Sequence, residues 1–232
     1  MIKPSDYFDL SMQSVYEIFK GADSVFDLLR TLPDRIDDML MSRRVIKGEV
    51  MAGAELGDRP IYVAPGARVE AGAYVVGPAY ISSGVVIRHG AYVREHCLFL
   101  EESLLGHASE AKLALFLPQA KAPHFAYVGD SILGHRVNLG AGTKLSNLPI
   151  VWSSGSKTLS LEVDGQIVDS GLRKMGAVLG DDVETGCNAV LNPGTLVGPR
   201  SLIYPSTNVS KGYHPPNSIV KLRQQIEVDV RV

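Results

Sequence analysis

Between residues 63 and 99 the chain repeats an aliphatic residue at every sixth position, and few folds can use that period. The repeated positions are Val63, Val69, Val75, Ile81, Ile87 and Val93, and Phe99 ends the run. A helix turns through about 600° in six residues, so these side chains would drift around its surface instead of forming one face. An antiparallel sandwich would show strict alternation, with a turn signal about every 8–12 residues. The period therefore indicates short strands joined by corners at equal intervals.

Glycine and proline stand where such corners need unusual backbone angles. Three short strands make one triangular coil, and stacked coils form a parallel solenoid with strands about 4.8 Å apart. The repeated aliphatic side chains then point inward and form ladders. The period returns at Leu133, Leu139 and Leu145, and again at Leu179, Thr185, Leu191, Val197, Ile203 and Val209. One prism with insertions explains this better than two domains.

Two segments depart from the period. Apolar residues recur every three or four positions in residues 5–42, which predicts two or three short helices divided at Gly21 and Pro33. We assign residues 1–44 to a helical cap and residues 45–232 to the solenoid, with an inserted arm at about 148–174. Within the arm, Asp164-Gly165 predicts a hairpin near residues 157–170, and Trp152 is expected to anchor its base.

Composition excludes several classes of function. The chain has 23 basic and 25 acidic residues, a net charge of −2 and a pI near 6.3, so no basic field favours nucleic acid or an acidic membrane surface. No apolar stretch approaches the ~20 residues of a membrane span, and acidic residues interrupt residues 1–20, where a signal peptide would lie. Two cysteines make no disulfide framework. We expect a cytoplasmic protein with neither nucleic acid nor membrane as a partner.

The segment AKAPHFAYVGDSILGHRVNLGAGTKLSN, residues 120–147, lies partly outside the period and carries the functional signal. It resembles the acetyltransferase half of the bifunctional bacterial enzymes that make UDP-N-acetylglucosamine, a glucosamine-1-phosphate N-acetyltransferase of the hexapeptide-repeat class. The matching positions are Lys121-Ala122-Pro123-His124, Tyr127, Gly129-Asp130, Val137-Asn138-Leu139-Gly140-Ala141-Gly142-Thr143 and Asn147. The arm followed by SGLRKMGAVLGDDVETG is similar to the archaeal sugar-1-phosphate branch. The resemblance covers roughly residues 60–215.

The resemblance implies an all-β, left-handed parallel β-helix that assembles as a homotrimer, with active sites between neighbouring prisms. It also implies direct transfer of an acetyl group from acetyl-CoA to an amino-sugar 1-phosphate, with no metal required. His124 matches the family's general base, a role that suits a group titrating near neutrality. Glu110 matches an acid that supports this histidine, Asn147 matches a residue that orients the substrate amine, and the Ala141 N–H would stabilise the oxyanion.

The same resemblance assigns the binding residues. Arg94, Lys112 and Lys174 fall where the family places basic residues that contact the sugar phosphate, and Tyr127 and Asn138 match residues lining the sugar site. The coenzyme A positions are Ala141, Gly142, Cys187 and Pro205. Two of these depart from the family, because Cys187 replaces a usual serine and Tyr204-Pro205 replace small alanines. These departures leave the identity of the acyl donor open.

Other readings remain. The first 44 residues are too short for a nucleotidyltransferase domain and contain only Gly21, so we expect no nucleotidyl transfer. A non-catalytic β-helix scaffold or sugar-phosphate sensor is the alternative from a different class. A related transferase could use galactosamine-1-phosphate or a nucleotide-linked amino sugar. A zinc carbonic anhydrase of the hexapeptide class would need three imidazoles, and the close histidine pair of that family is absent.

Overall fold

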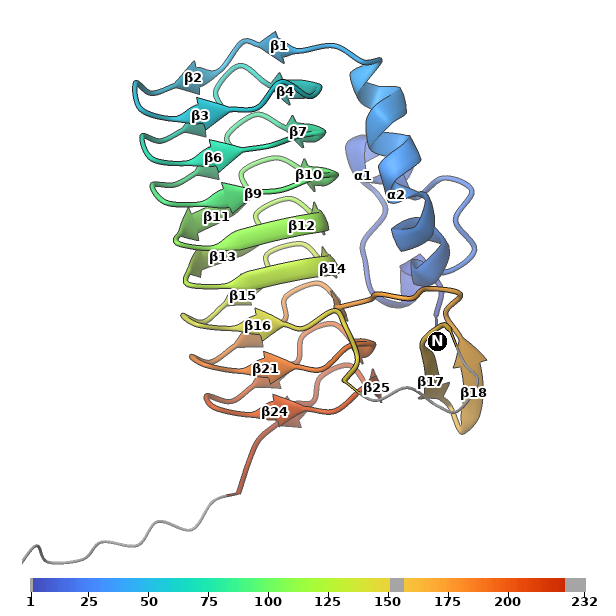
Figure 1. The fold of residues 1–232 in the computed structure, drawn as a ribbon. Coiled ribbons are helices and arrows are strands. Elements are labelled where there is room, and N and C mark those ends of the chain that lie inside the picture. The colour runs from blue at the N-terminus through green and yellow to red at the C-terminus, as the bar shows by residue number, and fades with distance from the viewer. Residues whose placement is uncertain (1, 151–156, 224–232) are drawn as a thin grey trace, which may run out of the picture.

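The computed structural model describes residues 2–150 and 157–223, which form a triangular β-solenoid with two helices and a hairpin along one side (Figure 1). All strand pairings within the prism are parallel, and the described residues build nine coils. The fold class predicted from the six-residue period is confirmed, and the architecture is consistent with the expected left-handed β-helix. Trp152, the predicted anchor of the arm, lies outside the described residues.

Each coil contributes one strand to each of three faces. Face one contains β1 (Val45–Ile46), β4 (Ile61–Val63), β7 (Ala79–Ile81), β10 (Cys97–Phe99), β19 (Ala177–Leu179), β22 (Thr195–Val197) and β25 (Gly212–His214). Face two contains β2 (Glu49–Val50), β5 (Arg68–Val69), β8 (Val86–Ile87), β11 (Leu104–His107), β13 (Lys121–His124), β15 (Asn138–Leu139), β20 (Glu184–Thr185), β23 (Leu202–Ile203) and β26 (Ile219–Val220). Face three contains β3 (Glu55–Leu56), β6 (Tyr74–Val75), β9 (Tyr92–Val93), β16 (Lys144–Leu145), β21 (Val190–Leu191) and β24 (Asn208–Val209).

Two longer strands join face three to face one without a break. They are β12 (Glu110–Phe116) and β14 (Tyr127–Leu133). The first residues of β12 pair with β9 on face three, and its last residues pair with β10 on face one. We call the edge that these strands cross the three–one corner, and the edge between faces two and three the two–three corner.

The predicted ladders form the core of the prism. Every ladder position named from the sequence is buried, and register pairs Val63 with Ile81 and Ile81 with Phe99. Below Phe99 the next ladder residue is Phe116, then Leu133, so these two coils are one residue shorter than the coils above. Each such side chain stabilises the fold by about 1.5–3 kcal/mol relative to exposure, and together they make the prism a stiff support.

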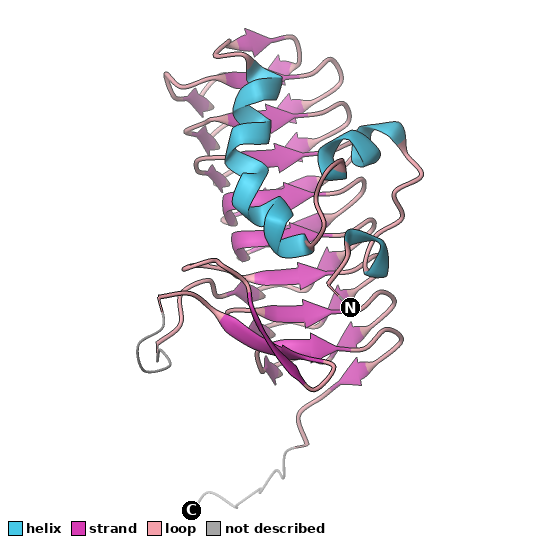
Figure 2. Cartoon of the chain, turned by 90° about the vertical axis from the view of Figure 1, so that its right-hand side faces the viewer, coloured by secondary structure: helices cyan, strands magenta, loops and turns pink. Residues whose placement is uncertain are grey.

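The N-terminal segment covers face one instead of closing the end of the prism (Figure 2). It contains a short 3-10 helix (Pro4–Asp6), α1 (Gln13–Phe19) and α2 (Val25–Leu40). Ser24 caps the N-terminus of α2, and its side chain accepts a hydrogen bond from the Asp27 N–H at 3.1 Å. Its apolar side packs on the outward-facing Leu98, Leu115 and Ile132 of the prism.

The expected division of the helices is half right. The chain turns at Gly21, but Pro33 lies inside α2 instead of ending it. A proline inside a helix costs about 3 kcal/mol. Helix α2 buries seven apolar side chains, of which Leu32 and Ile36 flank the proline. The burial outweighs the lost hydrogen bond, so the helix continues.

The inserted hairpin forms where Asp164-Gly165 predicts it. Strands β17 (Ser160–Val163) and β18 (Gln166–Asp169) pair antiparallel, and both turn residues have positive φ, 53° and 74°, as a two-residue hairpin turn requires. The hairpin packs beside β25 and covers the lower coils of face one, below α2 (Figure 2). Face one is therefore covered over much of its length, whereas faces two and three carry exposed side chains.

Candidate functional site on face three

His124 stands at the two–three corner. It is the last residue of β13, is exposed, and pairs in register with His107 one coil earlier. Its ring makes no hydrogen bond or ion pair with the described residues, whereas the Nδ1 atoms of His89 and His107 each contact a backbone carbonyl oxygen, at 2.6 and 2.9 Å. The imidazole of His124 is thus open to a ligand at this corner.

The predicted coenzyme A positions lie along the same corner, one coil below another. The Gly142 N–H donates to the His124 carbonyl at 3.0 Å, and the Asn188 N–H donates to the Ala141 carbonyl at 2.8 Å. In the next coil the Ser206 N–H donates to the Cys187 carbonyl at 2.9 Å. His124, Ala141-Gly142, Cys187 and Pro205-Ser206 therefore form one column, although they are spread over residues 124–206 of the sequence.

Two backbone donors in this column, the N–H groups of Ala141 and Cys187, meet no acceptor within the described chain. Gly142, the neighbour of Ala141, donates to His124. Ala141 is half-buried. An N–H held in a corner beside an imidazole is the arrangement that can accept a developing negative charge on oxygen.

A charged cluster extends from the middle of face three to the three–one corner. The Arg94 Nη1 donates to Glu110 Oε1 at 2.9 Å, and the Arg94 Nε lies 3.7 Å from Glu95 Oε2. The hydrogen bond to Glu110 raises the pKa of the guanidinium above its usual value. Within the described chain Glu110 makes no hydrogen bond to His124, so the expected support of that ring remains a prediction.

Lys112 and Asn147 meet around a carboxylate to which we assigned no function. The Lys112 Nζ lies 3.5 Å from Asp130 Oδ1 and 4.0 Å from Glu95 Oε1. The Asn147 Nδ2 donates to Asp130 Oδ2. Burial opposes ionisation of Glu95, but a backbone hydrogen bond and the charge of Arg94 outweigh it and keep the pKa of that carboxyl below its usual value.

Tyr127 completes the cluster. Burial, with the charges of Glu110 and Asp130, raises the pKa of its phenol, so the hydroxyl stays protonated at neutral pH. The neighbouring Asn147 side chain offsets part of this rise in the pKa. Gly129 provides the space for both groups, because a Cβ at this position would lie 2.6 Å from the Tyr127 hydroxyl and 2.8 Å from Asn147 Nδ2.

Two predicted site residues lie at the margin of this arrangement. Lys174 is exposed and immediately precedes Met175, whose N–H donates to the Asn147 carbonyl at 3.0 Å, so the chain at Lys174 passes beside the cluster. Asn138 lies on face two, where it lines a shallow cavity of about 340 Å³ with Lys121 and Arg136. Asn138 is therefore separated from the cluster by the two–three corner.

Sequence reasoning missed the acids. Glu95 directly follows Arg94, and Asp130 lies inside the quoted motif, yet neither received a role. Two of the three predicted phosphate-binding cations, Arg94 and Lys112, are already paired with carboxylates in this chain. The sequence could have indicated these pairs, because each of the two cations has an acidic residue nearby in its own coil or in the adjacent coil.

Within the residues that the structure describes, no group of three histidine, cysteine or acidic side chains is arranged to hold a metal ion. The two–three corner brings three imidazoles into one column, with the His89 and His107 rings stacked at 5.5 Å. Because the rings are stacked, the imidazole nitrogens are spaced along the column and do not converge on a single metal position.

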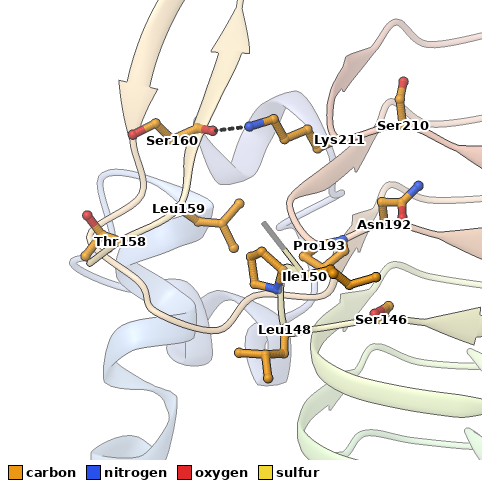
Figure 3. A pocket seen from close by; sticks show the side chains of 11 residues that line it. Ser146, Leu148, Ile150, Thr158, Leu159, Ser160, Asn192, Pro193, Ser210 and Lys211 are labelled. Atoms are coloured by element: carbon orange, nitrogen blue, oxygen red, sulfur yellow. Dashed lines mark hydrogen bonds between the residues drawn. The ribbon is translucent and has the colours of Figure 1, made fainter. Parts of the chain in front are cut away.

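A cavity of about 510 Å³ lies between the hairpin and the prism (Figure 3). Leu148, Leu159 and Pro193 line its apolar side, and Lys211 closes one end by donating to the Ser160 carbonyl at 3.3 Å. None of the predicted site residues lines it. The site residues instead lie on the open surface of face three and its two corners.

Comparison with known proteins identifies relatives in the family that the motif resembles. A bifunctional sugar-1-phosphate nucleotidylyltransferase/acetyltransferase from Sulfurisphaera tokodaii is 34% identical over 176 residues, which are 76% of this chain and 42% of that protein. The bifunctional protein GlmU of Methanococcus vannielii is 35% identical over 129 residues, 56% of this chain and 30% of the relative. The chain is a relative of the bifunctional sugar-1-phosphate nucleotidylyltransferase/acetyltransferases. The resemblance stated from the motif is confirmed at the level of the family, and the chain spans less than half the length of these relatives.

Solved structures with a similar fold are more distant. The Arabidopsis UDP-N-acetylglucosamine acyltransferase matches with a TM-score of 0.39 and 14% identity, covering 75% of this chain and 69% of that one. The acetyltransferase domain of PglB from Neisseria gonorrhoeae in complex with acetyl coenzyme A matches with a TM-score of 0.30 and 12% identity, covering 63% and 52%. At these values neither likeness supports a conclusion about the present chain. No family model matches it. Neither helix among the described residues is long and apolar enough to cross a membrane.

Proposed function

We propose that this chain is an N-acetyltransferase that transfers an acetyl group from acetyl-CoA to an amino-sugar 1-phosphate, with glucosamine-1-phosphate as the first candidate. The single observation that carries the proposal is the column at the two–three corner. It places an open imidazole directly above the predicted coenzyme A positions and at the edge of a face that holds the predicted sugar-phosphate residues. The sequence relationship supplies the class of reaction.

In the proposed reaction, His124 takes a proton from the sugar ammonium or from the attacking amine. The nitrogen then forms a bond to the acetyl carbonyl carbon, and the carbonyl oxygen becomes an oxyanion beside the Ala141 N–H. The carbon–sulfur bond breaks, the electron pair leaves with the coenzyme A thiolate, and the proton on His124 can neutralise it. Transfer is direct, so exposed Cys187 serves as a wall of the coenzyme channel and forms no acyl-enzyme.

The substrate would lie across face three. The Arg94 guanidinium has one nitrogen, Nη2, with no contact to the described acids, and Lys112 is held at 3.5 Å or more from its partners. Both can therefore turn donors toward a phosphate. The exposed Lys174 adds an uncommitted charge, because within the described residues its ammonium forms no ion pair. Tyr127 and Asn147 would face the sugar.

Assembly as a cytoplasmic homotrimer belongs to the same proposal. Face three leaves Tyr74 and Tyr92 exposed at 41% and 39%, stacked with ring centroids 5.7 Å apart, above the charged cluster. Packing of this face against the edge of a neighbouring prism would bury these rings. It would also let Asn138, on face two, join a site that it does not reach within one chain.

The decisive test is product identification. The protein is incubated with acetyl-CoA and a panel of amino-sugar phosphates, and thiol release is measured together with mass spectrometry of the products. We expect one N-acetylated sugar phosphate and stoichiometric coenzyme A. Absence of transfer across the panel would reject the proposal and favour the scaffold or sensor reading. Acetylation of galactosamine-1-phosphate or a nucleotide-linked sugar would assign that sugar as the substrate in place of glucosamine-1-phosphate.

The base is tested by His124→Ala, which should lower turnover by about 10²–10⁴-fold. His89→Ala is the matched control, because His89 is an exposed histidine on the same corner, two coils above. The control should stay within about threefold of the wild type, and both variants should keep the wild-type oligomeric state. Turnover by His124→Ala close to that of the control would remove the imidazole from the mechanism.

A further inference from the structure

Asp130 stands out because it is a buried acid at a position that needs none. It lies in β14 at the three–one corner, its side chain is 7% exposed, and its φ of 47° is left-handed. The register places Leu113 at the same corner one coil above, with φ 46°. In the coil below, Gly176 donates its N–H to the Asp130 carbonyl. The corner therefore accepts a leucine with the same left-handed backbone, and its geometry does not require a carboxylate.

The two carboxylate oxygens serve different partners. Oδ1 faces the Lys112 ammonium from the coil above, at 3.5 Å, and Oδ2 accepts from the Asn147 amide of the coil below. Lys112 is itself only 15% exposed. A buried charge is costly unless it is paired and hydrogen-bonded, and here both requirements are met by residues assigned to the acceptor site. One side chain thus fixes the separation of two groups that lie two coils apart.

The contact also decides which end of the Asn147 amide is available. A carboxylate can only accept, so it selects the NH₂ end of the amide. The remaining Oδ1 of Asn147 is then the atom that can accept a hydrogen bond from a substrate amine. An amine whose N–H is held this way has its lone pair directed elsewhere, as attack on a carbonyl requires.

We infer that Asp130 is a positioning residue, which sets the Lys112 ammonium and the Asn147 Oδ1 at the spacing of the phosphate and the amine of one amino-sugar phosphate. The inference rests on the proposed function and deepens it. Two separate effects follow. Loss of the charge should release Lys112 and weaken substrate binding, while loss of the whole side chain should also free the Asn147 amide to rotate and slow the chemical step.

Two substitutions separate these effects. Asp130→Asn keeps an acceptor for Asn147 but presents an uncharged amide to Lys112, so KM for glucosamine-1-phosphate should rise about tenfold with kcat nearly unchanged. Asp130→Ala removes both contacts, and kcat/KM should fall by about 100-fold with a loss in kcat as well. KM for acetyl-CoA should stay within about twofold in both variants, because the coenzyme column lies at the other corner.

Asp181→Asn is the matched control. Asp181 is also buried, at 8% exposed against 5% for Asp130, and accepts hydrogen bonds from the Asp9 and His135 N–H groups at 2.7 and 2.8 Å, away from the cluster. It should lower the melting temperature without changing either KM. If Asp130→Asn leaves KM for the sugar phosphate at the wild-type value, or shifts both substrates' KM values alike as a folding defect would, the inference is overturned.

Failure of the proposed function gives a different result. If the wild-type protein transfers no acetyl group, crystal structures of the wild type and Asp130→Asn still decide the positioning role. Displacement of the Lys112 ammonium in the variant, with Asn147 retained, supports it. Unchanged positions of both side chains would show that other contacts hold them and would overturn it.

Discussion

The coils between Val63 and Phe99 and the coils between Phe99 and Leu133 share one ladder but differ at their corners. In the upper coils the strands are two or three residues long, and glycines with positive φ, such as Gly72 and Gly90, form corners. The central coils are one residue shorter, and β12 and β14 run across the three–one corner without a break.

The shorter coil changes what a corner can present. With no loop at the three–one corner, Lys112 and Asp130 are held within strands: Lys112 pairs with Gly129, and the Asp130 carbonyl accepts from the Gly176 N–H of the coil below. In the upper coils the same corner is a separate turn between two strands, and Gly77, with φ 75°, lies in one of these turns. A repeat that loses one residue therefore converts a turn into a rigid platform for charged groups, while the ladder beneath it continues unchanged.

If the upper coils are support only, damage to them should affect stability and leave catalysis alone. Ile81→Ala removes a fully buried ladder residue between Val63 and Phe99. We expect a loss of about 2–5 kcal/mol in the free energy of unfolding, measured by denaturant titration. Values of kcat/KM per folded molecule at low temperature should equal the wild type. A specific rise in KM would mean that the upper coils also shape the site.

The central coils should show the reverse pattern. Gly129→Ala places a methyl group against the tips of Tyr127 and Asn147. Flexible side-chain ends can move aside, so the melting temperature should change little, while kcat/KM should fall about tenfold because both groups leave their positions.

Gly57→Ala provides the matched control in the upper region. Its Cβ would lie 2.7 Å from the Val76 carbonyl oxygen, a backbone atom that cannot move aside cheaply. This variant should lose stability without a change in KM. If Gly57→Ala and Gly129→Ala change kcat/KM equally, the upper and central coils do not differ in their role.

The smallest expected effect is on the pH dependence of the free energy of unfolding. The pKa of Glu95 is lowered in the folded protein, so its contribution to stability is present above the unfolded pKa and is lost as pH falls through the folded value. Glu95→Gln should therefore destabilise the protein at pH 7 by less than about 1 kcal/mol, since the side chain is 30% exposed. The difference from the wild type should shrink toward pH 3. A difference independent of pH would assign the effect to packing.

The ladders could be predicted from sequence because each inward position recurs at a fixed interval set by the triangular coil. The hairpin could be predicted because Asp164-Gly165 tolerates the two positive φ angles of its turn. The motif around His124 indicated both the family and the residues to examine. These signals are local, and each is fixed by backbone geometry that neighbouring residues determine.

The column and the cluster depend on long-range register, which the sequence does not display. One shortened coil and the inserted arm separate His124 from Cys187, so no constant period brings them together. The position of α2 along face one and its passage through Pro33 follow from packing against side chains of later coils, Leu98, Leu115 and Ile132 among them. The pairing of Asp130 with Lys112 and Asn147 also arises only once three coils are stacked.

The first residues of the chain are fastened near its far end. The Tyr7 carbonyl accepts from the Asp181 N–H at 2.9 Å, and the Asp9 N–H donates to the Asp181 carboxylate at 2.7 Å. During synthesis on the ribosome, the leading segment therefore has to wait until more than 170 further residues have emerged before it can settle. Contacts of such long sequence separation form slowly. Until then only part of the prism surface that buries the apolar side of α2 has formed. In the nascent protein, the earlier coils alone cover this side of the helix.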